Sequence, residues 1–245
     1  MSDMQPRLLL VLAALLAGLD LAEGREAAGA NGECVVLLHG LARTSASMGK
    51  MQAALVEAGY DVANVDYPSR DYAIQKLAPI AVEAGLAECR ADAQPGRIHF
   101  ITHSLGGILV REYMSRNEVP ELGRVVMLAP PNQGSQAADA MQDLPGFDWL
   151  SGPAGYQLGK GPGSVPLLLG PPDFEFAVIA GNRTIDPVTS AVLDDPDDGK
   201  VSVEDTKLDG MSDFRVVAVS HAYIMQNDEV IEYVQEFLAH GSFGD

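Results

Sequence analysis

The sequence predicts an α/β domain built on a mostly parallel sheet of about six strands, with helices on both faces. Two observations carry this prediction. Short, continuous apolar runs recur along the chain, as expected of parallel strands that are buried on both faces. Segments with apolar residues at helical spacing separate these runs, which is the pattern of repeated strand–helix–strand crossovers. A chain of 245 residues suits one such domain.

The apolar runs and the helical segments alternate along most of the chain. The predicted strands are residues 34–38, 62–66, 97–102, 125–129, 175–180 and 214–220. The predicted helices are residues 48–58, 72–90, 105–116 and 227–239, each with one apolar face. Pro79 lies inside the second helical segment, where a proline is expected to kink the helix or to restart it.

Two long segments interrupt this alternation. Residues 132–172 are rich in glycine and proline and contain one short helical stretch, and residues 182–213 are acidic. Long irregular insertions in a compact domain are usually functional loops or lids. The 132–172 insertion also carries several large apolar side chains. It is therefore a candidate lid, whose apolar residues either line a substrate site or simply pack on the domain.

The first thirty residues have the character of a targeting segment. Arg7 precedes an apolar run over residues 8–19, and Ala28-Gly29-Ala30 has the form of a signal-peptidase site. The apolar run is short for a bilayer span. We therefore expect residues 1–30 to be a signal peptide and residues 31–245 to be the domain, exported to the periplasm or secreted, with no stable membrane span after cleavage. A retained membrane anchor is the alternative.

Charge and cysteine content narrow the range of partners. The 34 acidic and 16 basic residues give a formal net charge of −18, which repels nucleic-acid phosphates, so no nucleic-acid partner is expected. The two cysteines, Cys34 and Cys89, fall at the start of a predicted strand and at the end of a predicted helix. Export makes a disulfide between them a reasonable hypothesis, with two buried free thiols as the alternative.

The most informative segment is Thr102-His103-Ser104-Leu105-Gly106, which lies between a predicted strand and a predicted helix. In a G-x-S-x-G motif the serine occupies a strained strand-to-helix turn that exposes its hydroxyl, and the helix N-terminus presents N–H groups beside it. Here Thr102 stands in place of the first glycine, which raises the steric demand of the turn. The flanking strand and helix nevertheless predict that Ser104 is a nucleophile.

A second motif, His39-Gly40-Leu41-Ala42, directly follows the first predicted strand. An acyl transfer needs fixed donors for the carbonyl oxygen that becomes negative. We expect the backbone N–H groups of Leu41 and Leu105 to be these donors, with Gly40 allowing the loop to approach closely. His39 is expected to hold this loop through a hydrogen bond.

His221 is the histidine best placed to act as a general base. It follows the last predicted strand, so it is expected at the same edge of the sheet as the serine turn. The other four histidines lie beside the serine, in the loop after the first strand, within a strand and in the C-terminal tail: His103, His39, His99 and His240. We expect the side chain of His103 to point away from the Ser104 hydroxyl.

The acid that orients His221 should lie between Ser104 and His221 in chain order. The candidates are Asp186, Asp194, Asp195, Asp197 and Asp198. Asp198 is favoured because Gly199 permits a sharp turn directly after it. Asp186 is the rival because it follows the preceding strand more closely, and Asp197 is a third choice.

At this point the chain resembles bacterial lipases and esterases of the α/β-hydrolase superfamily. The resemblance covers roughly residues 33–240 and rests on VVLLHGLART at 35–44, HFITHSLGGILVREY at 99–113, RVVMLAPPNQGS at 124–135, DDGKVSVE at 197–204 and VSHAYIMQNDEVI at 219–231. Similar lipases carry the acid in an Asp-Gly-x-Val turn and the histidine some twenty residues later. Asp198 and His221 match those positions, which implies an α/β-hydrolase fold with Ser104, Asp198 and His221 as a catalytic triad.

The resemblance implies a carboxylic-ester hydrolase, a carboxylesterase or a lipase, that forms an acyl-enzyme on Ser104. Its substrate would be a small-molecule or lipid ester, and no metal or organic cofactor would be needed. An acyltransferase, a thioesterase or an amidase would use the same triad, and a non-catalytic binding protein of this fold is a further alternative. The sequence leaves the acyl-chain length and the oligomeric state open.

Overall fold

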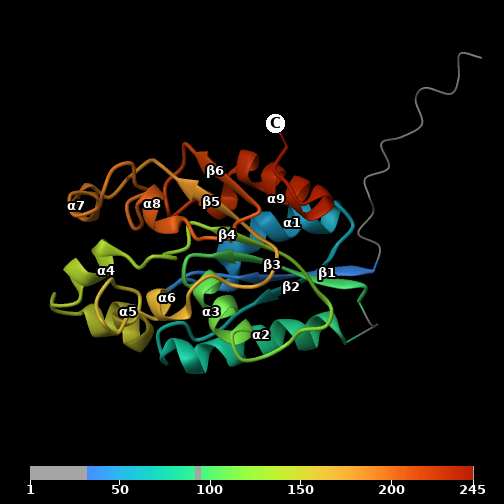
Figure 1. Ribbon diagram of the computed structural model, residues 1–245, viewed down its shortest axis with the longest axis horizontal. Coiled ribbons are helices and arrows are strands. Elements are labelled where there is room, and N and C mark those ends of the chain that lie inside the picture. Colours follow the sequence, from blue (N-terminus) through green and yellow to red (C-terminus); the bar gives the residue numbers. More distant parts are fainter. Residues whose placement is uncertain (1–31, 92–94, 245) are drawn as a thin grey trace, which may run out of the picture.

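The computed structural model describes residues 32–91 and 95–244, so the predicted signal peptide lies outside the described residues. Figure 1 shows a central sheet between two layers of helices. The strands are β1 (Glu33–Leu38), β2 (Asp61–Val65), β3 (Arg97–His103), β4 (Leu122–Leu128), β5 (Phe176–Gly181) and β6 (Asp213–Val217). The α-helices are α1 (Gly49–Glu57), α2 (Ile74–Cys89), α3 (Leu105–Met114), α4 (Gln136–Met141), α5 (Phe147–Tyr156), α6 (Val165–Leu169), α7 (Pro187–Ser190), α8 (Val203–Thr206) and α9 (Asp228–His240).

The strands form one parallel sheet in the order β2-β1-β3-β4-β5-β6. The chain steps outward from β1 to β2 and then crosses back to β3, so the direction of winding reverses beside β1. In open α/β sheets, sites form at such a reversal, outside the carboxyl ends of the strands. Here those ends are Leu38 of β1 and His103 of β3, and the two predicted site loops begin directly after them.

Side chains of successive strand residues point to opposite faces of the sheet and build two cores. On one face Val36 and Phe100 belong to the core that packs under α2 and α3. On the other face Leu37 and Ile101 belong to the core that packs under α1 and α9. Figure 1 shows these two helix pairs on opposite sides of the sheet. The predicted α/β architecture with helices on both faces is therefore confirmed.

All six predicted strands are present, with one correction at the last. Its prediction extended to residue 220, but β6 ends at Val217. The chain then turns, with the Val219 N–H donating to the Val217 carbonyl at 2.8 Å, so that Ser220 and His221 lie beyond the strand.

The helix prediction needs two corrections. The second helix does not restart at Pro79, because α2 runs from Ile74 to Cys89 with Pro79 inside it. The 132–172 insertion holds three helices, α4, α5 and α6, where one was expected. Its helix α5 was missed because Gly152 interrupts it with a non-helical backbone (φ 58°, ψ −169°).

Cys34 and Cys89 form the hypothesised disulfide, with their Cα atoms 5.7 Å apart. The bond joins the beginning of β1 to the end of α2, at the edge of the sheet opposite the carboxyl ends of the strands. None of the helices in the described part of the chain is long and apolar enough to cross a membrane.

Candidate active site

Ser104 occupies the turn between β3 and α3. Its backbone has φ 53° and ψ −118°, a conformation that costs energy for any residue with a side chain. Its N–H donates to the Leu128 carbonyl at 2.9 Å, which ties the turn to the neighbouring strand β4. The hydroxyl makes no capping bond to α3 although Ser104 is at the N-cap position, so the side chain is not used to stabilise the helix. This is the geometry expected of a nucleophile turn.

Thr102 fits this turn despite replacing the usual glycine. Its side chain is fully buried, and its hydroxyl points to the Val126 carbonyl at 3.5 Å. The Thr102 side chain therefore packs in the core between β3 and β4 and not against the serine.

The loop after β1 packs directly against the serine turn, and Gly40 permits this contact. A Cβ atom at Gly40 would lie 2.7 Å from His103 Nδ1 and 3.2 Å from Ser104 Cβ. Leu41 follows in the wall of the cavity that contains Ser104. The N–H of Leu105 has no acceptor within its own helix, because Leu105 is the first residue of α3. The two predicted oxyanion donors thus flank the serine.

His39 holds the same loop, as predicted. Its Nδ1–H donates to the Gly40 carbonyl at 2.8 Å, and its Nε2 accepts from the Tyr67 N–H at 3.4 Å. The Tyr67 ring stacks on the imidazole with centroids 4.1 Å apart, and the Tyr67 hydroxyl donates to the His39 carbonyl at 2.5 Å. Burial lowers the pKa of His39, in keeping with a neutral ring that has one donor and one acceptor.

His221 pairs with Asp198. Nδ1 of His221 lies 2.7 Å from Oδ2 of Asp198, and the His221 N–H donates to the Asp198 carbonyl at 3.0 Å. Because Nδ1–H faces the carboxylate, Nε2 is the ring nitrogen left to accept a proton from a nucleophile. The two side chains differ in exposure, since that of Asp198 is fully buried and that of His221 remains 13% exposed.

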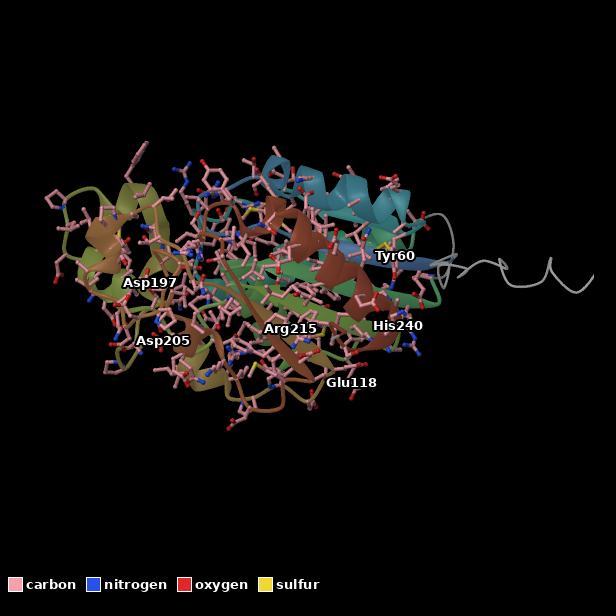
Figure 2. The ribbon with its side chains drawn as sticks, turned by 90° about the horizontal axis from the view of Figure 1, so that it is seen from above. Tyr60, Glu118, Asp197, Asp205, Arg215 and His240 are labelled. Atoms are coloured by element: carbon pink, nitrogen blue, oxygen red, sulfur yellow. A yellow bond between two sulfur atoms is a disulfide. The ribbon has the colours of Figure 1, made fainter. Side chains whose placement is uncertain are left out.

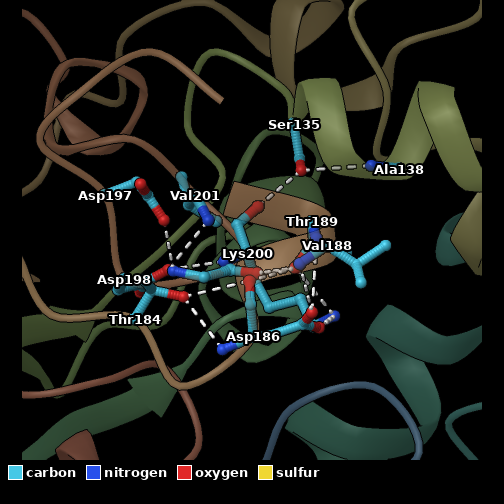
Figure 3. Close-up of polar contacts among 11 residues, drawn as sticks. Ser135, Ala138, Thr184, Asp186, Val188, Thr189, Asp197, Asp198, Lys200 and Val201 are labelled. Carbon is cyan, nitrogen blue, oxygen red and sulfur yellow. Dashed lines mark hydrogen bonds and ion pairs between the residues drawn. The ribbon is translucent and has the colours of Figure 1, made fainter. Parts of the chain in front are cut away.

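The turn after Asp198 explains why this carboxylate keeps its orientation. Its Oδ1 accepts from the N–H groups of Lys200 at 2.9 Å and Val201 at 2.8 Å, as Figure 3 shows. Gly199 provides the sharp bend with φ +94°. One carboxylate oxygen is thus fixed by the backbone and the other is directed to His221.

The rival acids have other roles. Oδ1 of Asp186 accepts from the N–H groups of Val188 and Thr189 at the start of α7, and its Oδ2 lies 2.8 Å from Lys200 Nζ (Figure 3). The hydrogen bond from Lys200 is the main reason that the pKa of Asp186 is lowered. Asp197 accepts from the Gly199 N–H and the Ser190 hydroxyl, both at 2.6 Å. Of the candidate acids, Asp198 is the one that the structure brings to His221.

The remaining histidines lie elsewhere or serve the scaffold. Figure 2 shows His240 and Asp197 at opposite ends of the molecule, so His240 is remote from the acid turn. His99 is buried within β3, where it accepts from the Arg124 N–H at 2.9 Å and contacts Glu33 at 3.3 Å.

The sequence predicts no role for His103, but in the structure its side chain bonds to the loop that carries His221. Its Nε2–H donates to the His221 carbonyl at 3.0 Å, and the two rings lie with centroids 4.8 Å apart. His103 directly precedes Ser104, so this bond joins the nucleophile turn to the base loop. Because the two histidines are far apart in the chain, the sequence holds no signal of this bond.

A cavity of about 240 Å³ contains Ser104 and His221 in its wall. The 132–172 insertion supplies one side of this wall through apolar residues of α4, α5 and the segment after it: Ala137, Met141, Phe147, Leu150 and Leu158. Trp149 of the same insertion points outward and is 79% exposed. The insertion therefore lines the cavity with some of its apolar residues and exposes others.

Both ends of the insertion are held by one buried side chain of α3. Arg111 donates from Nη1 to Asn132 Oδ1 at 3.0 Å and from Nη2 to the Pro166 and Gly170 carbonyls at 2.9 Å and 2.8 Å. Burial lowers the pKa of Arg111 to about 10, which leaves it charged near neutral pH. A second anchor is Ser135, which caps α4 and donates to the Lys200 carbonyl at 2.7 Å in the acid turn (Figure 3).

Comparison with known proteins identifies the family of this chain. Residues 35–241 match the alpha/beta hydrolase family. The chain therefore belongs to the alpha/beta hydrolase family, as its resemblance implied. No curated protein matches the sequence.

Solved structures with the same fold include lipases and esterases. Mature lipase BlEst2 of Bacillus licheniformis is 21% identical, with a TM-score of 0.64 over 86% of this chain and 93% of that chain. Phospholipase PlaB of Legionella pneumophila is 19% identical, with a TM-score of 0.68 over 87% of this chain and 60% of that chain. The metagenomic carboxyl esterase MGS0156 is 20% identical, with a TM-score of 0.61 over 79% of this chain and 65% of that chain. This chain thus spans less than two thirds of the last two, and identities this low establish the fold alone.

Proposed function

We propose that the protein is a serine carboxylic-ester hydrolase that acts through an acyl-enzyme on Ser104. The pairing of Asp198 with His221, which lines the same cavity as Ser104, supports this proposal most directly. The strained backbone of Ser104 adds to it, because such strain is kept where a side chain must be aimed. The lipases and esterases among the structural neighbours agree with it.

In the first step the Ser104 hydroxyl attacks the ester carbonyl and His221 Nε2 takes its proton. The N–H groups of Leu41 and Leu105 hold the negative oxygen of the tetrahedral intermediate. As the intermediate collapses, His221 gives the proton to the leaving alcohol. Water then attacks the acyl-enzyme with His221 as base, so that one ester and one water yield one acid and one alcohol.

Asp198 keeps the imidazole of His221 in the tautomer that this sequence of steps needs. A buried carboxylate beside Nδ1 also stabilises the imidazolium that forms in each step. The carboxylate does not need to take the proton itself. The acyl part of the ester would lie against the apolar side of the cavity that the 132–172 insertion supplies.

We also propose that the domain is exported after removal of residues 1–30. The Cys34–Cys89 disulfide supports export, because disulfides persist mainly in oxidising compartments. Expression of the full chain with a C-terminal tag and N-terminal sequencing of the tagged product test this proposal. A mature product that begins near residue 31 outside the cytoplasm is expected, and an intact N-terminus in the cytoplasm would refute it.

A fluorophosphonate probe and p-nitrophenyl butanoate together test the enzymatic proposal. The wild-type protein should take one label, and Ser104→Ala should lose the label and about 10⁴-fold or more in kcat. Ser47→Ala is the matched control, because Ser47 lies in the turn before α1, where its hydroxyl and its N–H both donate to the Thr44 carbonyl. A wild-type protein that takes no label would instead indicate a binding protein of this fold. Product analysis with added alcohol separates hydrolysis from acyl transfer.

A further inference from the structure

Arg43 lies in the wall of the cavity that also contains Ser104 and His221. It directly follows the loop that carries Leu41. The Arg43 N–H donates to the Gly40 carbonyl at 3.3 Å, and the preceding Ala42 N–H donates to the Ser69 hydroxyl at 3.0 Å. These two hydrogen bonds hold the backbone at Arg43 and at the residue before it.

The guanidinium of Arg43 has no carboxylate partner within the described part of the chain. Its hydrogen bond to the Ala222 carbonyl is long, at 3.5 Å, which leaves most of its five N–H donors for other acceptors. Other arginines of this acidic protein do have such partners. Arg90, Arg116 and Arg124 pair with Glu121, Glu112 and Glu175. The wall of the cavity therefore carries an uncompensated positive charge in a protein whose formal net charge is −18.

Lys200 is the other cationic residue of the cavity wall, and it differs in this respect. Its Nζ lies 2.8 Å from Asp186 Oδ2, so its charge is already compensated (Figure 3). Of these two cations, Arg43 is therefore the one that can attract an anionic ligand.

The position of Arg43 indicates which part of a substrate it would meet. Its contact with Ala222 places the guanidinium beside His221, the group that protonates the leaving alcohol. The apolar wall formed by residues such as Met141, Phe147 and Leu150 comes from the 132–172 insertion instead. The cavity thus has an apolar part suited to an acyl chain and a cationic part next to the base.

From this arrangement we infer that Arg43 forms a subsite for an anionic group, a carboxylate or a phosphate, on the alcohol part of the ester. This inference rests on the proposed function and names a substrate class for it. The planar fork of a guanidinium binds both anions through paired hydrogen bonds. Because the site is partly open to solvent, added salt should weaken the interaction.

The test compares butanoate esters that differ only in the alcohol part. One probe is the ester of 4-hydroxybenzoate, a second is the ester of 4-hydroxyphenylphosphonate, and the neutral reference is the ester of methyl 4-hydroxybenzoate. The measured quantity is the ratio of kcat/KM for each anionic ester to that for the neutral ester. Taking this ratio within each variant cancels the different reactivities of the alcohols when variants are compared.

Arg43→Gln should lower this ratio about tenfold for at least one anion at low salt. Arg43→Lys keeps the positive charge and should give a ratio between those of Arg43→Gln and the wild-type protein. The anion with the larger loss is the group that the subsite prefers. Arg97→Gln is the matched control, since Arg97 is exposed at the amino end of β3, at the opposite edge of the sheet, and should leave both ratios unchanged.

An equal loss on anionic and neutral esters in Arg43→Gln would overturn the inference. The inference would also be overturned if Arg43→Gln lowered the kcat/KM ratio by the same factor for an anion on the acyl side. This second ratio is measured with p-nitrophenyl hemiglutarate against p-nitrophenyl pentanoate. A wild-type protein that cleaves none of these esters and takes no fluorophosphonate label would refute the proposed function instead, so the two failures are distinguishable.

Discussion

His103 donates a hydrogen bond from Nε2 to the backbone carbonyl of His221 at 3.0 Å, although 118 residues separate the two in the chain. His103 is the last residue of β3 and directly precedes Ser104, so the bond fixes the base loop relative to the nucleophile turn. Burial, with smaller contributions from His221 and Arg43, holds the pKa of His103 well below its usual value. A neutral ring with Nε2–H as its donor fits both observations.

His103 is therefore expected to be a positioning residue. His103→Phe removes the donor and should lower kcat at least about tenfold, the effect of losing one buried hydrogen bond, with a smaller change in KM. His103→Gln can place an amide N–H near the position of Nε2 and should restore much of kcat. The shape of the pH–rate profile near neutral pH should be the same in His103→Gln and wild type, because burial holds the pKa of His103 well below its usual value. Equal kcat values in the Phe and Gln variants would contradict this role.

Asp198 and Asp186 can be separated by isosteric substitution. Asp198→Asn should lower kcat about 10³- to 10⁴-fold, because an amide at this position favours the wrong tautomer of His221. Asp186→Asn should keep most of the activity, since Asp186 caps α7 and pairs with Lys200 rather than with His221. Steady-state kinetics on p-nitrophenyl butanoate measures both effects, and the reverse pattern would show that the acid is Asp186.

Arg111 should contribute strongly to stability. Arg111→Met leaves buried acceptors at Asn132, Pro166 and Gly170 without their donor and should lower the free energy of unfolding by about 3 kcal/mol. Urea denaturation measures the loss. Lys50→Met is the control, because the exposed pair of Lys50 with Asp228 should be worth about 1 kcal/mol or less. Similar losses in the two variants would rule out a special role for Arg111.

Acidification should destabilise the protein through its buried histidines. Burial lowers the pKa of His39, His99 and His103 below the value of about 6.5 that they take in the unfolded chain. Below that pH the unfolded state binds more protons than the folded state. The contribution of these neutral rings to stability is therefore fully present above about pH 6.5 and is lost as the pH drops further. Each such histidine adds a slope of up to about 1.4 kcal/mol per pH unit.

Urea denaturation between pH 7.5 and 5 measures this slope. His103→Gln removes one of the three titrating groups and should make the slope shallower. A slope that is unchanged in His103→Gln would show that this histidine takes up no proton on unfolding in this range.

The disulfide should be a further source of stability. Cys34 and Cys89 are 55 residues apart, and a cross-link that closes a loop of this length is worth about 4 kcal/mol in the chain-entropy account. The double variant Cys34→Ser/Cys89→Ser should lose stability of this order in urea. Since the chain has two cysteines, a thiol assay on the denatured protein should find none before reduction and two after it. Free thiols without reductant would contradict the bond.

The strands could be predicted from sequence because their signal is local. Phe176–Gly181 is a continuous apolar run that is buried on both faces of the sheet, and β1 shares this character over most of its length. Helix α5 has no such signal. Gly152 and Pro153 break its periodicity, and its apolar residues face two ways, with Phe147 in the cavity wall and Trp149 exposed.

The predicted site residues lie together because each follows the carboxyl end of a strand. Ser104 and Leu41 could be located by the motifs in which they stand, and His221 by its place after the last strand. The contributions of His103 and Arg111 could not be foreseen in this way. Apart from the bond of Arg111 to Asn132 Oδ1, their hydrogen bonds go to backbone carbonyls, which every residue has, so no residue type in the sequence marks these acceptors.

The hydrogen bonds of Arg111 to both Asn132 and Gly170 have a consequence for the length that the segment between these two residues can take. The two ends of the segment between them are thus bonded to the same guanidinium of α3, which closes this segment into a loop. Doubling the length of such a closed segment costs only about 0.6 kcal/mol of chain entropy. We therefore expect that a longer or shorter piece between these two attachment points would reshape the wall of the cavity while the strands keep their register.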